Sequence, residues 1–323
     1  MLVTGAGGFI ASHLTEELAR RGARVRALVH YNSRSHWGFL ERLDPELSRR
    51  VELRPGDVTD PSCVLDLVKG QDAVFHLAAL IAIPYSYAAP ASYVSTNVSG
   101  TLNVLEACRR RNVRKLVQTS TSEVYGTALY APIDEAHPLQ GQSPYSASKI
   151  GADHLAESFF RSFGLPVAIA RPFNTYGPRQ SARAVIPTII CQLLRQPPEL
   201  KLGSLKPVRD FNFVADTVEG FLAVAASPKS VGQAINLGSG RGVSVAETAA
   251  LIARLLGLRA RIKADKARLR PADSEVYRLI CDNRKARRLL GWRPRYSLEE
   301  GLALTIDYIR RHRADYKAGV YNV

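Results

Sequence analysis

Short apolar runs alternate with amphipathic segments through the first half of the chain. The runs are rich in β-branched residues and have the length of strands; they cover residues 1–5, 24–29, 51–57, 72–78, 115–121 and 166–172. Between several of them, segments 12–22 and 100–112 carry apolar residues at helical spacing and end near Gly or Asn. Strands that alternate with helices form a parallel sheet covered on both faces. The pattern therefore predicts an α/β fold with a doubly wound parallel sheet.

The alternation loosens after residue 172. Loops rich in Pro, Gly and Arg lead to a strand-like run at 234–240 and amphipathic segments at 244–257 and 298–313. Because this region cannot easily build its own sheet core, we expect a smaller mixed α/β lobe over the carboxyl ends of the strands, where open α/β sheets bind ligands. We assign residues 1–172 and about 209–240 to the sheet domain, and residues 173–208 and 241–323 to the lobe.

Composition and charge limit the class of protein. The chain has 323 residues, 46% of them hydrophobic, which supplies a substantial core. The formal net charge is +15, but Arg and Lys are spread through every segment, so we expect no nucleic-acid partner. The apolar stretch 73–94 is interrupted by His76, Pro84 and Pro90, so we expect no membrane span.

The N-terminus and the cysteines give two further expectations. The chain begins MLVTGAGG, which leaves no room for an export signal before the first strand, so we expect a cytoplasmic protein. Cys63, Cys108, Cys191 and Cys281 lie far apart, without a C-x-x-C pair or a His cluster. We therefore expect buried thiols and no metal site.

A glycine cluster follows the first predicted strand directly. Gly5, Gly7 and Gly8 open the first helix, and Phe9 and Ile10 continue the turn. Glycine lets the backbone turn tightly and approach a pyrophosphate closely, while the helix N-terminus offers free N–H groups and a partial positive charge. At this position in an alternating α/β chain, the cluster predicts a dinucleotide-binding site.

The end of the second strand bears on the choice between NAD and NADP. A carboxylate commonly stands there to bind the adenosine ribose, but this chain has His30, Ser33 and Arg34 instead. Without an acid, nothing repels a 2′-phosphate and Arg34 could pair with it, so NADP is favoured over NAD; a solvated Arg34 would leave the choice open. The other cofactor contacts that we predict follow later strands: Asp57, Val58, Leu77, Ala78, Ala79, Thr119 and Pro172.

Tyr145 and Lys149 lie four residues apart in YSASK and so share one face of a helix. A nearby ammonium stabilises a phenolate and lowers its pKa. Such a pair can take a proton from an alcohol while a nicotinamide takes the hydride. The spacing alone is common, but here it follows a dinucleotide-binding pattern and a strand end, TSTS, that offers hydroxyls to a substrate.

The order and spacing of these motifs resemble the extended short-chain dehydrogenase/reductases of the nucleotide-sugar epimerase and dehydratase group. Matching blocks span nearly the whole chain: TGAGGFIASHL, GDVTD, HLAA, NVSGTLNVLEA, TSTSEVYG, YSASK, RPFNTYGPR, RDFNFVADT, NLGSG and DNRKARRLLGW. The resemblance implies a Rossmann domain, a tightly held NAD or NADP, a nucleotide diphosphate sugar as substrate, and a homodimer with a four-helix interface.

Roles of single residues follow from their places in these blocks. Thr121 resembles the hydroxyl that binds the reacting sugar oxygen, Tyr145 the base that deprotonates the C4 hydroxyl, and Lys149 the residue that holds the nicotinamide ribose. Asn97 and Thr101 are expected to position the strand and the cofactor. The resemblance further implies substrate contacts from Thr121, Glu123, Asn174, Arg179, Arg209, Asn236 and Arg270.

Glu123 distinguishes among the reactions of this group. Epimerases that the chain resembles carry a small residue there, because oxidation at C4, rotation and re-reduction need no second base. A 4,6-dehydratase needs a carboxylate to remove the C5 proton so that the C6 hydroxyl departs. Ser122 replaces the aspartic acid of glucose-type dehydratases, which leaves the proton donor open between Glu123 and a water held by Ser122. The triplet Thr121-Ser122-Glu123 resembles GDP-mannose 4,6-dehydratases, and UDP-glucuronate decarboxylases carry a similar one.

Three stretches, 31–41, 77–87 and 172–190, resemble the dehydratases of legionaminic-acid-type pathways. We therefore expect a 4,6-dehydratase that converts UDP- or GDP-N-acetylglucosamine to its 4-keto-6-deoxy derivative. The alternatives are a UDP-glucuronate decarboxylase, a 4-epimerase of the same group, and a non-catalytic nucleotide-binding regulator built on the same fold. The nucleobase and the C5 configuration of the product stay open.

Overall fold

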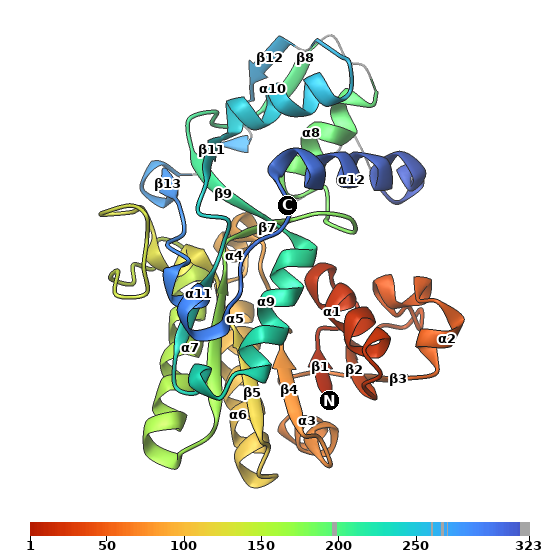
Figure 1. The fold of residues 1–323 in the computed structure, drawn as a ribbon, viewed down its shortest axis with the longest axis vertical. Coiled ribbons are helices and arrows are strands. Elements are labelled where there is room, and N and C mark those ends of the chain that lie inside the picture. Colours follow the sequence, from red (N-terminus) through yellow and green to blue (C-terminus); the bar gives the residue numbers. More distant parts are fainter. Residues whose placement is uncertain (196–198, 260, 266–267, 270, 317–323) are drawn as a thin grey trace.

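A seven-stranded sheet runs through the larger part of the chain in the computed structural model, which describes residues 1–195, 199–259, 261–265, 268–269 and 271–316 (Figure 1). Its strand order is β10-β6-β5-β4-β1-β2-β3, and every pairing in it is parallel. The strands are β1 (Leu2–Thr4), β2 (Val25–His30), β3 (Val51–Gly56), β4 (Ala73–His76), β5 (Lys115–Thr119), β6 (Val167–Pro172) and β10 (Ala234–Leu237). This order confirms the predicted doubly wound parallel sheet.

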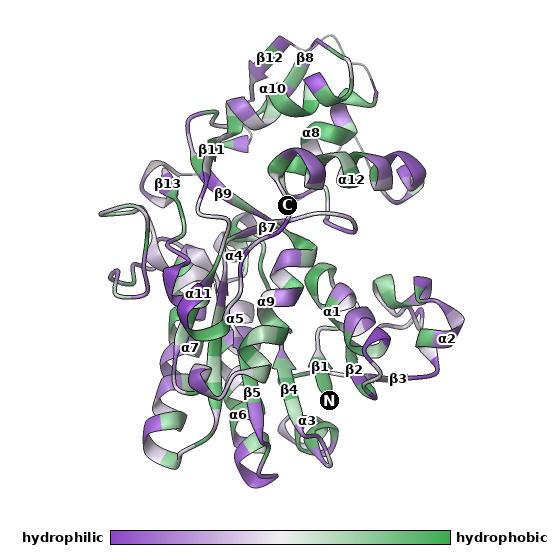
Figure 2. Cartoon of the chain, in the orientation of Figure 1, coloured by the Kyte–Doolittle hydropathy of each residue, from purple (hydrophilic) through white to green (hydrophobic). Residues whose placement is uncertain are grey.

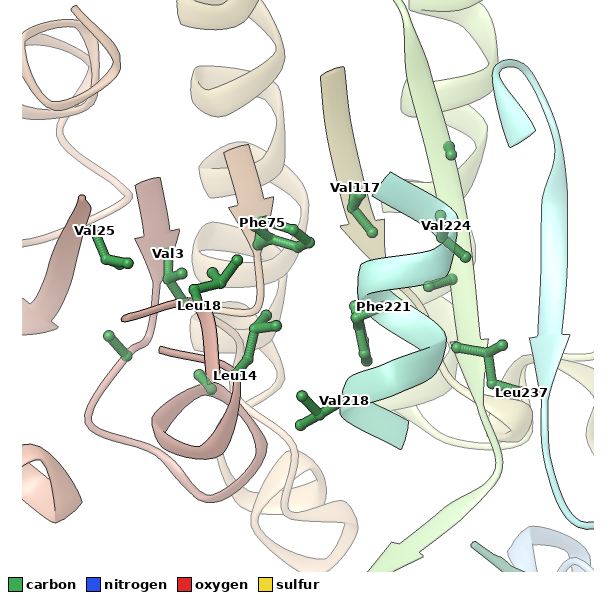
Figure 3. Close-up of a cluster of buried hydrophobic side chains, with 14 of the residues drawn as sticks. Val3, Leu14, Leu18, Val25, Phe75, Val117, Val218, Phe221, Val224 and Leu237 are labelled. Carbon is green, nitrogen blue, oxygen red and sulfur yellow. The ribbon is translucent and has the colours of Figure 1, made fainter. Parts of the chain in front are cut away.

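Helices cover both faces of the sheet, and each face has its own apolar cluster. On one face, α1 (Phe9–Arg20) and α9 (Val214–Ala226) pack side by side over Val3, Phe75 and Val117 (Figure 3). On the other face lie α3 (Pro61–Val68), α6 (Gly100–Arg110) and α7 (Pro144–Phe163). Because side chains alternate along a strand, Leu2 joins the second cluster and its neighbour Val3 the first. The buried strands accordingly colour as hydrophobic in Figure 2.

The helix that carries the predicted base has strong start and stop signals. Ser143 caps α7 and forms a capping box with Ser146, and Pro144 occupies the first helical position. Gly164, in the left-handed conformation, ends the helix. Its twenty residues therefore hold their register against β6 and α6.

A smaller lobe lies beyond the carboxyl ends of the large sheet (Figure 1). Its strands are β7 (Asn174–Tyr176), β9 (Val208–Phe213), β11 (Gly242–Ser244) and β13 (Arg278–Leu279) in one sheet, with β8 (Glu199–Leu202) and β12 (Arg261–Ala264) paired separately. Three helices pack with them around a third apolar cluster: α8 (Val185–Leu193), α10 (Val245–Leu255) and α12 (Leu298–Arg311). The remaining helices are η1 (Gly38–Arg42), α2 (Pro45–Ser48), α4 (Ile83–Ala88), α5 (Pro90–Tyr93), the π-helical η2 (Val94–Ser99), η3 (Ser122–Tyr125), η4 (Pro228–Ser230), η6 (Ala272–Ser274), α11 (Arg284–Leu290) and η7 (Arg313–Asp315).

The chain crosses between sheet domain and lobe at positions that differ from our assignment. Strand β9 pairs with β7, β11 and β13, so the segment that returns to the large sheet begins with α9 rather than near residue 209. Helix α11 lies against β10, and Ala286 and Trp292 join the apolar cluster of the large sheet, although we expected them in the lobe. Both side chains are buried there.

Two further features concern membranes and cysteines. Among the described residues, no helix is long and apolar enough to cross a membrane. The four cysteines are free thiols, of which Cys108, Cys191 and Cys281 are buried and Cys63 is half-buried.

Candidate active site

The glycine-rich loop between β1 and α1 packs against the backbone of two other loops. Gly5 has a φ of +68°, and a Cβ there would lie 2.9 Å from the backbone nitrogen of Ala78. A Cβ on Gly7 would lie 2.9 Å from the carbonyl oxygen of Trp37. No side chain caps the N-terminus of α1, so its first N–H groups are left for an anionic ligand such as a pyrophosphate. This arrangement fits the predicted dinucleotide, with Gly8, Phe9 and Ile10 at the helix start.

Gly38 packs against the glycine-rich loop between β1 and α1. Its φ is +67°, a Cβ there would lie 2.3 Å from the carbonyl oxygen of Gly7, and the N–H of Phe39 donates to that oxygen at 3.1 Å. We expect Gly38→Ala to lower the free energy of unfolding by about 2–4 kcal/mol, because left-handed strain and overpacking add. Gly22→Ala is the matched control, since Gly22 has a φ of +88° and nothing within 4 Å of its Cβ position; its cost is about 1–2 kcal/mol. Equal shifts of the urea midpoint in the two variants would contradict the contact.

The loop after β2 exposes the side chains proposed to recognise the adenosine ribose. His30, Ser33 and Arg34 are exposed, and the guanidinium of Arg34 makes no hydrogen bond or ion pair with any described residue. The side-chain oxygen of Asn32 accepts from the N–H groups of Arg34 and His36, at 3.2 and 3.0 Å, which folds the loop. Asp57 lies 3.5 Å from His30 across this edge. The loop thus presents the cation of Arg34; among the described residues, the carboxylates in contact with this region are Asp57, beside His30, and Glu41, beside His36 and the N–H of Trp37.

A buried chain of polar groups holds the end of β4. The hydroxyl of Thr4 accepts from the N–H groups of Leu77 and Ala78 at 3.1 and 3.0 Å, and it contacts Nδ1 of His76 at 2.8 Å. The other nitrogen of His76 lies 3.2 Å from the hydroxyl of Thr101. Burial lowers the pKa of His76 to about 3, so the ring is neutral. Our sequence reasoning missed Thr4 and His76; the available signal was a polar residue at the end of each of two apolar strands.

Asn97 links the loop after β4 to α7, the helix that carries Tyr145 and Lys149. Its amide pairs with both the N–H and the carbonyl of Leu80 at 2.9 Å, and it donates to the hydroxyl of Ser148 at 2.9 Å. Asn97 lies in the π-helical segment before α6, an irregularity that is frequent at functional sites. Asn97 thus holds Leu80 and Ser148, and Thr101 contacts His76; that the two residues position the cofactor stays a prediction.

Tyr145 and Lys149 lie buried on one face of α7 at the end of β5. The side chain of Lys149 donates to the carbonyl of Thr119 at 2.6 Å, and the hydroxyl of Tyr145 is hydrogen-bonded to the side chain of Thr121. Burial lowers the pKa of Lys149 to about 8, against the charge of Asp153. Burial also raises the pKa of Tyr145, although the bond with Thr121 lowers it. Lys149 is not among the groups that shift the pKa of Tyr145, so the expected lowering by Lys149 is not found; its ammonium is bonded to the carbonyl of Thr119.

Glu123 lies beside this pair. Thr121 caps the short helix η3, and its hydroxyl accepts from the N–H of Glu123 at 3.2 Å. Ser122 is buried, whereas Glu123 is half-buried. The charge of Glu123 contributes to the raised pKa of Tyr145, and the short helix η3 that carries Glu123 packs against α7. Within the described residues, the carboxylate of Glu123 has no hydrogen bond and no ion pair, so it is available to a substrate.

The residues predicted to contact the substrate differ in their surroundings within the protein. Asn174 begins β7, and its side-chain oxygen is buried without a hydrogen-bond partner among the described residues, as expected of a group that awaits a donor. Arg209 is nearly buried, 3.5 Å from Glu275, and donates to the carbonyl of Val208. Arg270 lies outside the described residues.

Two further residues predicted to bind substrate, Arg179 and Asn236, have partners within the protein, and their contact with substrate stays a prediction. Arg179 pairs with Glu16 of α1 at 2.6 Å and donates to the hydroxyl of Ser12, so it joins the lobe to the sheet domain. Asn236 is fully buried; its amide accepts from the hydroxyl of Tyr125 and donates to a backbone carbonyl. Sequence could not reveal these contacts because the partners lie more than a hundred residues away along the chain.

The predicted cofactor residues come together because they follow the carboxyl ends of adjacent parallel strands. Asp57 and Val58 follow β3, Ala79 follows β4, and Thr119 and Pro172 end β5 and β6. The hydroxyl of Thr119 is buried without a partner among the described residues, beside the carbonyl that Lys149 contacts. Within the same residues, no group of three or more His, Cys, Asp or Glu side chains could hold a metal ion.

Comparisons with known proteins agree with this geometry. The family model described as GDP-mannose 4,6 dehydratase matches residues 2–305. A dTDP-glucose 4,6-dehydratase from Streptomyces venezuelae, solved with NAD and TYD bound, is 31% identical with a TM-score of 0.86, covering 98% of each chain. A UDP-glucuronic acid 4-epimerase from Bacillus cereus, solved with UDP-glucuronic acid and NAD, is 29% identical with a TM-score of 0.86, covering 96% of this chain and 99% of that one.

A third relative performs another reaction. The UDP-glucuronic acid decarboxylase 1 of Xenopus tropicalis is 33% identical over 96% of this chain and 72% of its own length. The family match confirms the resemblance to extended short-chain dehydrogenases that the motifs indicated. The chain therefore belongs to the GDP-mannose 4,6 dehydratase family and is an enzyme of the NAD-dependent nucleotide-sugar dehydratases, epimerases and decarboxylases.

Proposed function

We propose that this enzyme is a nucleotide-sugar 4,6-dehydratase whose substrate is UDP- or GDP-N-acetylglucosamine. The observation that carries the proposal is the carboxylate of Glu123, which has no partner among the described residues and lies on η3, the short helix that packs against α7, where Tyr145 stands. Redox isomerisation at C4 needs only the base and the hydroxyl, whereas elimination needs a second base for C5. The N-acetylhexosamine part of the proposal is supported by the motifs at 31–41, 77–87 and 172–190.

Two residues accept protons in this reaction: Tyr145 from the C4 hydroxyl and Glu123 from C5. When bound, the nicotinamide dinucleotide would accept a hydride from C4 and later return it to C6. Thr121 holds the C4 oxygen, and Tyr145 takes the hydroxyl proton as C4 becomes a ketone. Glu123 then removes the C5 proton, which the ketone has acidified, and the C6 hydroxyl leaves. That hydroxyl needs a proton to depart as water, either from Glu123 or from a water held by Ser122. When the hydride returns to C6, C5 takes up a proton from solvent or from Tyr145, so that the net loss is one water. Lys149 would hold the nicotinamide ribose.

We further propose that the enzyme prefers NADP and works as a homodimer. The exposed Arg34 in a loop that lacks a ribose-binding carboxylate at the end of β2 supports the first part. The exposed apolar side chains of Val94, Leu102 and Phe163, on η2, α6 and α7, support a helical interface.

Arg34→Ala should weaken NADP binding by roughly 10-fold or more and leave NAD binding nearly unchanged, because a charge-assisted bond contributes about 1.5–3 kcal/mol. Arg24→Ala, another exposed arginine, is the control. The measurement is the dissociation constant of each cofactor by calorimetry. A loss that is equal for NAD and NADP would show that Arg34 does not recognise the phosphate.

The experiment that tests the proposed reaction is mass spectrometry of products from separate incubations with UDP-N-acetylglucosamine, GDP-N-acetylglucosamine and UDP-glucuronate. A product lighter by one water from an N-acetylglucosamine nucleotide is the expected result. Carbon dioxide from UDP-glucuronate would instead identify a decarboxylase. An isomer of unchanged mass would identify a 4-epimerase.

A further inference from the structure

A buried ion pair lies next to the segment that carries Glu123. Asp153 of α7 and Arg171 of β6 meet at 3.0 Å, with side chains 0% and 3% exposed. One oxygen of Asp153, Oδ2, accepts from Nε and Nη2 of Arg171 and, at 2.6 Å, from the hydroxyl of Ser120. Two buried charges cost desolvation energy that their attraction scarcely offsets, so such a pair is weak evidence of a gain in stability.

The pair reaches both ends of the segment Thr121–Tyr125. Ser120, which Asp153 holds, immediately precedes this segment. At the other end, the hydroxyl of Tyr125 accepts from Nη1 of Arg171 at 3.1 Å and donates to Asn236 of β10 at 2.7 Å. The guanidinium of Arg171 also lies 5.3 Å from the centre of the Tyr125 ring. Each end of the segment therefore has a side-chain bond to this ion pair, in addition to the backbone bonds of Ser120 with Ala170 and of Val124 with Gln140.

Asp153, the acidic member of the ion pair, lies on α7 together with Tyr145 and Lys149. Asp153 stands four residues after Lys149 and eight after Tyr145 on α7, so the three share one helical face. Tyr145 and Lys149 have other anchors, since Lys149 contacts Thr119, and Ser148 is held by Asn97. Glu123 differs, because its carboxylate has no partner among the described residues and its place follows from the backbone of η3 alone.

We propose that the Asp153–Arg171 pair positions Glu123 against Tyr145, and that Tyr125 is a positioning residue for the elimination half of the reaction. The inference rests on the proposed dehydratase function. Loosening the Tyr125 end of the segment displaces Glu123, while Tyr145 and Lys149 keep their own contacts. Oxidation at C4 therefore survives a change that slows proton removal at C5.

The test compares Tyr125→Phe with Tyr176→Phe in the full-length enzyme. Tyr125→Phe removes the hydroxyl that joins Arg171 to Asn236 and keeps the ring; Tyr176→Phe removes a buried hydroxyl that donates to the carbonyl of Leu298 in the lobe. C4 oxidation is followed in single turnover by the absorbance of reduced nicotinamide, and C5 deprotonation by uptake of solvent deuterium. For Tyr125→Phe we expect deprotonation and water loss to slow roughly 10- to 100-fold, as for a misplaced catalytic group. Oxidation and KM should stay within about 2-fold of the wild type, because Tyr145 and Lys149 keep their own contacts.

Asp153→Asn tests the ion pair itself and should slow water loss more strongly; because the charge of Asp153 also raises the pKa of Lys149, this variant can slow oxidation as well, and Tyr125→Phe is the variant that separates the two halves. Because that variant leaves Arg171 buried without its counter-charge, its fold is checked first by circular dichroism, and Tyr125→Phe decides the question if it unfolds. Equal slowing of oxidation and elimination in Tyr125→Phe, or behaviour like Tyr176→Phe, would overturn the inference while the wild type still dehydrates. A wild type that removes water from no sugar nucleotide would overturn the proposed function, and the inference with it.

Discussion

Glu123→Gln is expected to abolish water loss while C4 oxidation continues. The amide keeps the size of the side chain but cannot accept the C5 proton, and the loss of a general base typically costs 10²- to 10⁴-fold. Reduced nicotinamide should accumulate on addition of the sugar nucleotide, and mass spectrometry should find no dehydrated product. The structure gives Glu123 no contact with a described residue that the substitution would break, so the fold should be unaffected.

Glu219→Gln is the matched control, since Glu219 lies on the surface and pairs with Arg21. It should change neither half of the reaction. Normal dehydration by Glu123→Gln would show that another group removes the C5 proton. Loss of oxidation together with elimination would show that Glu123 acts earlier than we propose.

Tyr145→Phe should remove both halves of the reaction. Without the phenolic oxygen, nothing accepts the C4 hydroxyl proton, and the bond with Thr121 is lost as well. We expect the rate of C4 oxidation to fall about 10²- to 10⁴-fold, the range for general acid–base catalysis. The measurement is the single-turnover absorbance of reduced nicotinamide, with Tyr176→Phe as the control for loss of a buried hydroxyl. A variant that still oxidises C4 at the wild-type rate would assign the base elsewhere.

Glu123→Gln and Tyr145→Phe together distinguish the role of the carboxylate from the role of the phenol. Glu123→Gln should stop the reaction after oxidation, whereas Tyr145→Phe should stop it before oxidation. An epimerase would need only the second group, so its activity would survive Glu123→Gln. The pair therefore tests the assignment of reaction as well as the residues.

The strands and the cofactor loop were predictable because their signals are local. Strands buried on both faces are nearly continuous apolar runs, so the apolar residues 167–170 indicated β6 directly. The glycines were predictable because tight turns and close backbone approach restrict the residue type. The predicted run at 234–240 marked β10 but extended past its end at Leu237, since the glycines that follow form a loop around Asp210.

Contacts between distant segments were not predictable in the same way. Arg179 resembled a substrate contact, but its partner Glu16 is known only once α1 and the lobe are placed together. Arg171 offered a partial signal, because a charged residue inside a buried strand requires a counter-charge. The sequence did not show that Asp153 supplies it.

The direct junctions between the two parts of the molecule limit how the enzyme can open. Strand β9 ends at Phe213 and α9 begins at Val214, while β6 ends at Pro172 and β7 begins at Asn174. Because these junctions contain at most one residue between the two elements, rotation of the lobe as a whole would have to bend packed strands and helices. We expect sugar nucleotides to enter and leave through rearrangement of side chains and loops, or through small sliding of packed elements, instead of wide domain rotation.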